Sequence, residues 1–316
     1  MRCELKRTLL YVVCACAVSG LLAAAGRQPA KVELRLKPGK VVTFAVKRTS
    51  SIEGSSSRGE FKSKGTSTIE YRIALSEKKE SGEVVLNVSY GAAKVNVKSS
   101  RGEWTFDSQN PTGDDPATTY VKGILGKTFT VTVSGNAIKE IRGFPEREEG
   151  RFNVGRMFFS AFGMRRDLNL ILSTPVLGKV LKKGSIYAPP PREAAAQGMR
   201  RFRGFGLQVA YCFEGIEQKG RVSVATFSLK AAPPQEGARE SSFKSETDIK
   251  GSALIVLRDG LPRRVNLRVK SKTEGERQGQ SFKFTRTLNI SVRRVRATRA
   301  GGPKGRRRAK KAAEKT

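Results

Sequence analysis

The chain has 316 residues with 61 Lys and Arg against 28 Asp and Glu, a formal net charge of +33, and no histidine. The absence of histidine excludes Ser-His-Asp and Cys-His nucleophilic sites and histidine-ligated metal centres. We therefore expect a protein that is not an enzyme and uses no cofactor or metal. A histidine-independent hydrolase is the alternative.

Residues 1–25 have the pattern of a secretory signal peptide. Basic residues precede an apolar run from Leu9 to Leu22, and small residues up to Ala25 follow. We expect a secreted or periplasmic protein that is cleaved near Ala25 and keeps no transmembrane span after cleavage. The alternative is a lipoprotein anchored at Cys16.

Residues 31–145 form a first strand-rich half. Apolar and polar residues alternate in several runs, most clearly over residues 42–46, 69–75 and 84–90. Alternation with a period of two predicts strands with one apolar and one polar face. The runs are separated by turn residues, which favours antiparallel meanders.

The acidic pair Asp114 and Asp115 lies between Pro111 and Pro116. The proline and glycine content of this stretch predicts an exposed loop. We interpret the two carboxylates as solvated charge, with a weak calcium site or a catalytic pair as the alternatives.

Residues 146–182 form a helical connector between the two strand-rich halves. Val154, Phe158 and Phe162 recur every four residues, which predicts a helix from residue 151 to about 172. Such a stripe packs as plain core or lines a cavity. The candidate ligand-binding residues are an apolar wall and two rim cations: Met157, Phe158, Phe162, Arg165 and Arg166.

Residues 183–295 form a second strand-rich half. Segments 126–135 and 251–260 both begin and end with glycine, and both continue into another strand-like run, which suggests an internal repeat. We predict a mostly β (α+β) fold, in which two related antiparallel strand-rich halves form one or more curved sheets around the central helical segment.

The order of these elements resembles a large family of exported bacterial proteins classed only as a domain of unknown function. The pieces that carry the resemblance are the signal peptide, the strand opening at residues 32–39, the hairpin at 126–141 and the strand at 206–214. A looser similarity is to periplasmic lipoprotein and lipid carriers. That similarity implies a strongly curved antiparallel sheet that wraps around helices and leaves an apolar cavity, but it transfers no residue roles.

Basic residues gather in two further places, after the proline run at 189–191 and in the tail at 296–316. We expect the tail to be disordered because it lacks apolar residues. The candidate anion-binding residues are Arg200, Arg201, Arg203, Arg306, Arg307 and Arg308. Ordinary solvated charge is the alternative for both groups.

These observations leave two functional hypotheses. The first is a non-enzymatic cell-envelope protein that binds a lipid or anionic amphiphile in an apolar cavity between the curved sheet and the central helix. The second is a structural or adhesive envelope protein that binds anionic polymers through its basic surface and tail. Export argues against nucleic acid as a partner in either case.

Overall fold

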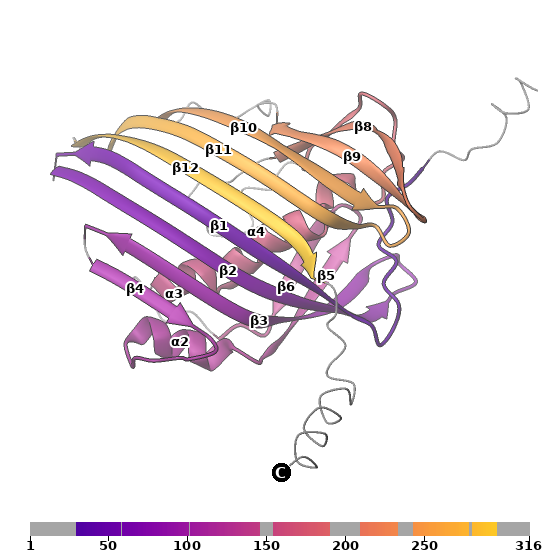
Figure 1. Cartoon of the computed structure of the whole chain (residues 1–316), viewed down its shortest axis with the longest axis horizontal. Helices are drawn as coiled ribbons and strands as arrows, with labels where there is room; N and C mark the ends of the chain where they lie inside the picture. Colours follow the sequence, from indigo (N-terminus) through magenta and orange to yellow (C-terminus); the bar gives the residue numbers. More distant parts are fainter. Residues whose placement is uncertain are drawn as a thin grey trace, which may run out of the picture.

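One antiparallel sheet of twelve strands organises the chain in a computed structural model (Figure 1). The structure describes residues 30–57, 59–100, 102–145, 154–189, 209–232, 243–277 and 280–295. The strand order is β6-β5-β3-β2-β1-β12-β11-β10-β9-β8-β7, and β4 pairs with β3 outside this path. The predicted strand-dominated, antiparallel fold is therefore confirmed.

The strands differ greatly in length, and the longest lie at the centre of the sheet. They are β1 (Val41–Ser56), β2 (Gly59–Lys78), β3 (Val84–Ser99), β4 (Gly102–Asp107), β5 (Thr128–Ser134), β6 (Ala137–Arg142), β7 (Ile186–Tyr187), β8 (Val209–Lys219), β9 (Val222–Ala231), β10 (Phe243–Val256), β11 (Leu261–Arg277) and β12 (Gln280–Val295).

The pairing of β1 with β12 joins the two ends of the described chain into one sheet. The two strands run antiparallel, with Val46 opposite Val292. The two segments proposed as a repeat occupy different places, because β5 lies next to the edge strand β6 whereas β10 lies between β9 and β11. The predicted internal repeat is not confirmed.

The sheet curves around the helical segment, which covers one of its faces. The helical elements are α2 (Pro116–Ile124), α3 (Val154–Phe158), α4 (Ala161–Ile171) and the 3-10 turn η1 (Thr174–Val176). Helix α4 contacts β6 and β11, and η1 contacts β6 and β8, so elements from both halves of the sheet reach the same helical segment. We call the face that carries α3 and α4 the inner face and the opposite face the outer face (Figure 1).

Alternating side chains make the inner face apolar. In β1, Val42, Phe44 and Val46 are buried, while Lys47 and Thr49, which point to the other side of the strand, are exposed. Buried Ile69 and Tyr71 continue the inner face on β2. This one-sided pattern is typical of an antiparallel sheet with one solvated face.

The connector is not the single helix that was predicted. Helix α3 ends at Phe158, and α4 begins after Ser160, whose side chain caps the Gly163 amide. A Cβ atom on Gly163 would lie 2.6 Å from the Phe158 carbonyl oxygen, so the two helices meet at a distance that only glycine permits. The prediction was wrong because four-residue spacing of apolar residues does not reveal such a break.

Phe159 anchors the junction between α3 and α4. Its side chain is fully buried, with its ring centroid 5.3 Å from that of Tyr90 and 6.2 Å from that of Phe106. The Tyr120 hydroxyl of α2 donates a 2.8 Å hydrogen bond to the Phe159 carbonyl oxygen. The junction is thus held by the sheet on one side and by α2 on the other.

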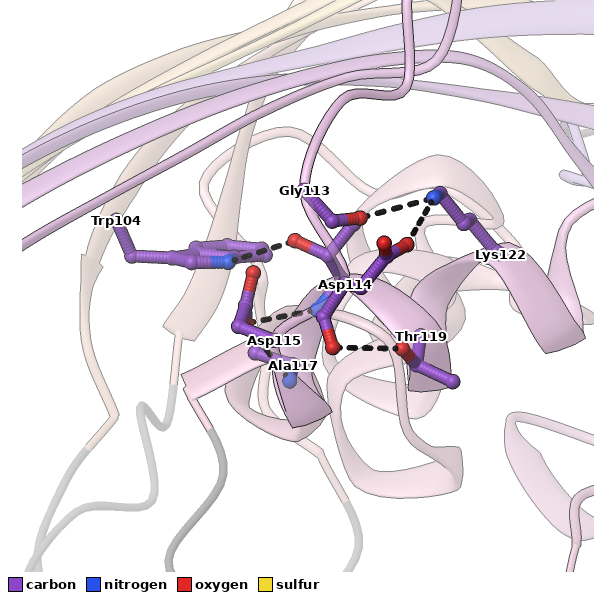
Figure 2. A network of polar contacts seen from close by, with 8 residues as sticks. Trp104, Gly113, Asp114, Asp115, Ala117, Thr119 and Lys122 are labelled. Carbon is purple, nitrogen blue, oxygen red and sulfur yellow. Dashed lines mark hydrogen bonds and ion pairs between the residues drawn. The ribbon is translucent and has the colours of Figure 1, made fainter.

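Helix α2 was not predicted, and it gives one of the two loop aspartates a structural role. Asp115 is the N-cap of α2, and its carboxylate accepts hydrogen bonds from the Ala117 and Thr118 amides at 2.9 and 3.0 Å (Figure 2). Asp114 is almost fully exposed and pairs with Lys122 at 3.4 Å. Solvated charge therefore describes Asp114 but not Asp115.

Candidate anion-binding site

An ion pair between β1 and α4 lies in the interior. The alternation that turns Phe44 and Val46 inward also places Arg48 on the inner face, where it is only 5% exposed. Its guanidinium forms an ion pair with the carboxylate of Asp167, which is completely buried. The Tyr71 hydroxyl donates a 2.5 Å hydrogen bond to the other oxygen of the same carboxylate.

Two more arginines approach this pair. Arg166 of α4 has its Nε atom 3.4 Å from the Asp167 Oδ1 atom. Arg286 lies on β12 at an even-numbered position, like the buried Leu288 and Ile290, so its side chain shares the inner face with Arg48. The site therefore brings three arginines near one carboxylate.

The three positive charges repel one another, which makes the charged form of each arginine less favourable. Burial, and next the positive Arg166, lower the pKa of Arg48 to about 9. Burial chiefly lowers the pKa of Arg166, with a further contribution from Arg286, and burial also lowers the pKa of Arg286. Arg48 stays protonated near neutral pH, and among the described residues a single aspartate leaves two of the three positive charges without a counter-charge.

Several polar atoms of the site have no hydrogen-bond partner in the part of the chain that the structure describes. They include Nε and Nη1 of Arg48, Nε of Arg286, the Tyr90 hydroxyl and the hydroxyl of Ser67, which lies directly opposite Arg48 on β2. Buried donors without partners are costly, and they are rare in folded proteins. These residues are therefore the candidate site for an acidic group.

The inner face beyond Arg286 is lined by half-buried aromatic rings. Phe61 of β2 and Phe284 of β12 flank Gly54, where a Cβ atom would lie 2.8 Å from the Phe61 ring and 2.6 Å from the Phe284 Cβ atom. Phe282 stacks on Phe284 with ring centroids 6.1 Å apart. Cationic and apolar groups thus adjoin on one surface.

The residues predicted from the connector separate into three environments. Met157 and Phe162 are 52% and 39% exposed, and half-buried Phe158 packs against the core. Arg165 donates hydrogen bonds to the carbonyl oxygens of Ile138 and Lys139 on β6. Arg166 is the one candidate among them that reaches the buried cluster.

The other predicted anion-binding residues lie outside the described residues. These are Arg200, Arg201, Arg203, Arg306, Arg307 and Arg308, together with the predicted signal peptide and the tail. Within the described ranges, no helix is both long and apolar enough to cross a membrane.

Sequence reasoning missed Arg48, Asp167, Tyr71 and Arg286. A signal was present in two of the strands, where a charged residue follows an apolar series on the same face: Arg48 follows Val42, Phe44 and Val46, and Arg286 precedes Leu288 and Ile290. A charge at a core position indicates a buried partner or a ligand.

No protein-family profile and no curated protein matches the sequence, so the two resemblances drawn from the sequence remain predictions. Among solved structures, an outer membrane channel from Pseudomonas putida F1 is similar with 9% identity and a TM-score of 0.26, over 85% of this chain and 100% of that chain. DynF from the dynemicin biosynthesis pathway of Micromonospora chersina has 6% identity and a TM-score of 0.19, over 86% and 95%. OpdQ of Pseudomonas aeruginosa has 6% identity and a TM-score of 0.20, over 81% and 100%. TM-scores this low support no inference about this chain.

Proposed function

We propose that this chain is an exported, non-enzymatic protein of the cell envelope, and that it binds a lipid or other anionic amphiphile on the inner face of its curved sheet. The observation that carries the proposal is the set of three inward arginines around one carboxylate, with donors left unpaired. Export is inferred from the sequence pattern of residues 1–25, which lie outside the described residues.

The arginines suit an acidic head group. A guanidinium presents a fixed fork of donors that matches a carboxylate or phosphate, and such charge-assisted bonds are stronger than neutral ones. Arg48 is committed to Asp167, whereas Arg286 has no ion-pair partner among the described residues. Arg286 is therefore the cation to which the proposal assigns the ligand's acidic group.

The aromatic rings beyond Arg286 suit the apolar part of the same ligand. Phe61 and Phe284 lie on either side of Gly54 in one row across the inner face. The adjacent row on the same face contains Arg286, which pairs with Ile52. Contact of an alkyl chain with these rings would remove apolar surface from water, a gain of about 25 cal/mol per Å². An amphiphile satisfies both parts of this surface, which a small inorganic anion would not.

Binding of defined amphiphiles tests the proposal. We expect dodecyl phosphate or dodecanoate to bind by calorimetry, and uncharged dodecanol to bind at least about tenfold more weakly, since it cannot pair with Arg286. Native mass spectrometry of the purified full chain should also show a co-purified acidic lipid. Equal affinity for dodecanol would overturn the role of the arginines.

A substitution at Arg286 separates binding from folding. Arg286→Met should lower affinity for dodecyl phosphate about tenfold and leave stability unchanged or raised, because it removes an uncompensated half-buried cation. Arg293→Met is the matched control, since Arg293 lies on the outer face of the same strand and is exposed. Unchanged affinity in Arg286→Met, or an equal loss in both variants, would reject the proposal.

A further inference from the structure

A shallow hollow of about 300 Å³ lies on the outer face, away from the helices. It spans four adjacent strands, β1, β12, β11 and β10. Three cations and four amide or hydroxyl side chains line it: Lys47, Lys250, Arg268, Thr49, Asn266, Asn289 and Ser291. None of the groups at the buried arginine cluster takes part in it.

Strand register brings these side chains together. Lys47 is opposite Ser291, and Ser291 is opposite Asn266, which forms one row across three strands. In the adjacent row Asn289 is opposite Arg268, and Arg268 is opposite Lys250. Directly opposed residues on one face of a sheet lie within about 5 Å of each other at their Cβ atoms.

The cations of the hollow are incompletely neutralised. Lys250 pairs with Asp248 at 3.3 Å. Lys47 and Arg268 are exposed, and neither has an ion-pair partner among the described residues. In the next row, Lys270 of β11 lies opposite Asp248. Asp248 is thus one carboxylate near four cations on this part of the face: Lys47, Lys250, Arg268 and Lys270.

The neutral side chains offer hydrogen bonds to a polyhydroxylated ligand. Asn266 uses its carbonyl oxygen to accept from Arg264 and from the Ser291 hydroxyl, both at 3.1 Å. This arrangement fixes the amide and leaves its NH₂ group to donate outward. Asn289 on β12 has an exposed side chain. Amides and hydroxyls between cations match the alternating hydroxyl and acidic groups of an acidic sugar chain.

We propose that this outer-face hollow binds an acidic polysaccharide, which pairs its acidic groups with Lys47 and Arg268 and its hydroxyls with Asn266 and Asn289. No aromatic side chain lines the hollow, so it lacks the stacking platforms that single-stranded nucleic acid uses. The apolar residues of its lining, Leu267 and Ile290, are buried, so their side chains offer little surface to a lipid tail. This site is separate from the inner-face site, and the protein can therefore hold an envelope polymer and an amphiphile on opposite faces.

The test compares two double variants of the full chain that lose the same charge. Lys47→Ser with Arg268→Ser removes the two unpaired cations of the hollow. Lys127→Ser with Lys139→Ser removes two exposed cations near the β5–β6 edge. We expect the first variant to bind dextran sulfate and alginate at least about tenfold more weakly, and the second to stay within about twofold of the natural chain, because screened charges act locally.

Binding measurements with other polymers identify the ligand class. Neutral dextran should not bind, and single-stranded poly(dT) should bind more weakly than dextran sulfate at equal ionic strength. Equal losses in the two double variants would mean that net charge alone drives binding, and would overturn the proposal. Tighter binding of poly(dT) would overturn the polysaccharide assignment. Arg286→Met should leave polymer binding unchanged, so failure of this proposal and failure of the amphiphile proposal are distinguishable.

Discussion

The Tyr71 hydroxyl and the Asp167 carboxylate are joined by a 2.5 Å hydrogen bond, although the two residues lie 96 positions apart in the chain. The same carboxylate pairs with Arg48. Asp167 therefore fixes α4 to β1 and β2 at once. The contact sets the position of Arg166, the preceding residue of the helix, against the inner face of the sheet.

Removal of the Asp167 charge should strongly destabilise the protein. Asp167→Asn leaves three arginines with no described counter-charge, and breaking a buried pair in this way costs about 3–5 kcal/mol. Urea unfolding followed by circular dichroism measures the loss. A double change, Arg48→Met with Asp167→Leu, should recover most of the stability, since it removes both buried charges.

A surface pair provides the control for that experiment. Glu274 and Lys283 lie 2.6 Å apart, but both side chains are more than half exposed. Glu274→Gln should cost no more than about 1 kcal/mol because solvent screens the pair. A loss in Asp167→Asn as small as that in Glu274→Gln would contradict the structural role of the buried pair.

The two adjacent aspartates before α2 should differ in their contribution to stability. Asp115→Ala removes an N-cap and should lower the free energy of unfolding by about 1 kcal/mol. Asp114→Ala should change it by no more than about 0.5 kcal/mol, because Asp114 is solvated. Trp104 donates a 3.3 Å hydrogen bond to Thr118 in the first turn of α2, so tryptophan fluorescence reports this region (Figure 2). Equal effects of the two substitutions would refute the cap.

Phe159 and Phe162 should respond very differently to truncation. Phe159→Ala empties a fully buried position and should cost about 3–5 kcal/mol. Phe162→Ala, at a position 39% exposed, should cost far less. Thermal unfolding of the two variants gives the comparison. The reverse order would show that Phe162, as the sequence pattern suggests, is the core residue.

Two buried tyrosines should each contribute a loss of stability at alkaline pH, because burial disfavours their ionised form. Burial raises the pKa of Tyr71 and of Tyr211 to about 12, above the ordinary value of 10.0. The folded-state pKa lies above the unfolded value, so this stability is fully present below pH 10 and is lost as the pH rises through 12. Each group accounts for about 3 kcal/mol across that window.

Urea unfolding at pH 9 and pH 12 measures this effect. Tyr211→Phe should lose about 2 kcal/mol less than the natural chain between the two pH values, because it lacks one ionisable group that is half ionised in the folded state at pH 12. The same alkaline loss in both proteins would show that Tyr211 does not contribute. Absorbance of tyrosinate, recorded in parallel, shows whether ionisation accompanies unfolding.

Local pattern determined most of the secondary structure. Period-two alternation over residues 42–46 and 69–75 specifies strands and their buried face, because successive side chains on a strand point to opposite sides. The break at Ser160 and the helix after Asp115 escaped prediction, since each depends on a short polar cap within a stretch that the wider pattern dominates.

The composition alone excludes catalytic and metal sites that need histidine, and it indicates a strongly basic surface. The alternation of residues 42–48 alone places Arg48 on the same face as the apolar residues. The tertiary structure decided what Arg48 meets there. Its ion-pair partner Asp167 comes from α4, and its neighbours Tyr71 and Arg286 come from β2 and β12, the two strands that pair with β1. Alternation fixes which face a side chain occupies but not which distant segment pairs with its strand, because that choice depends on the packing of the whole sheet around the connector. The arginine cluster therefore depends on the pairing of the first strand with the last and on the position of α4 against them.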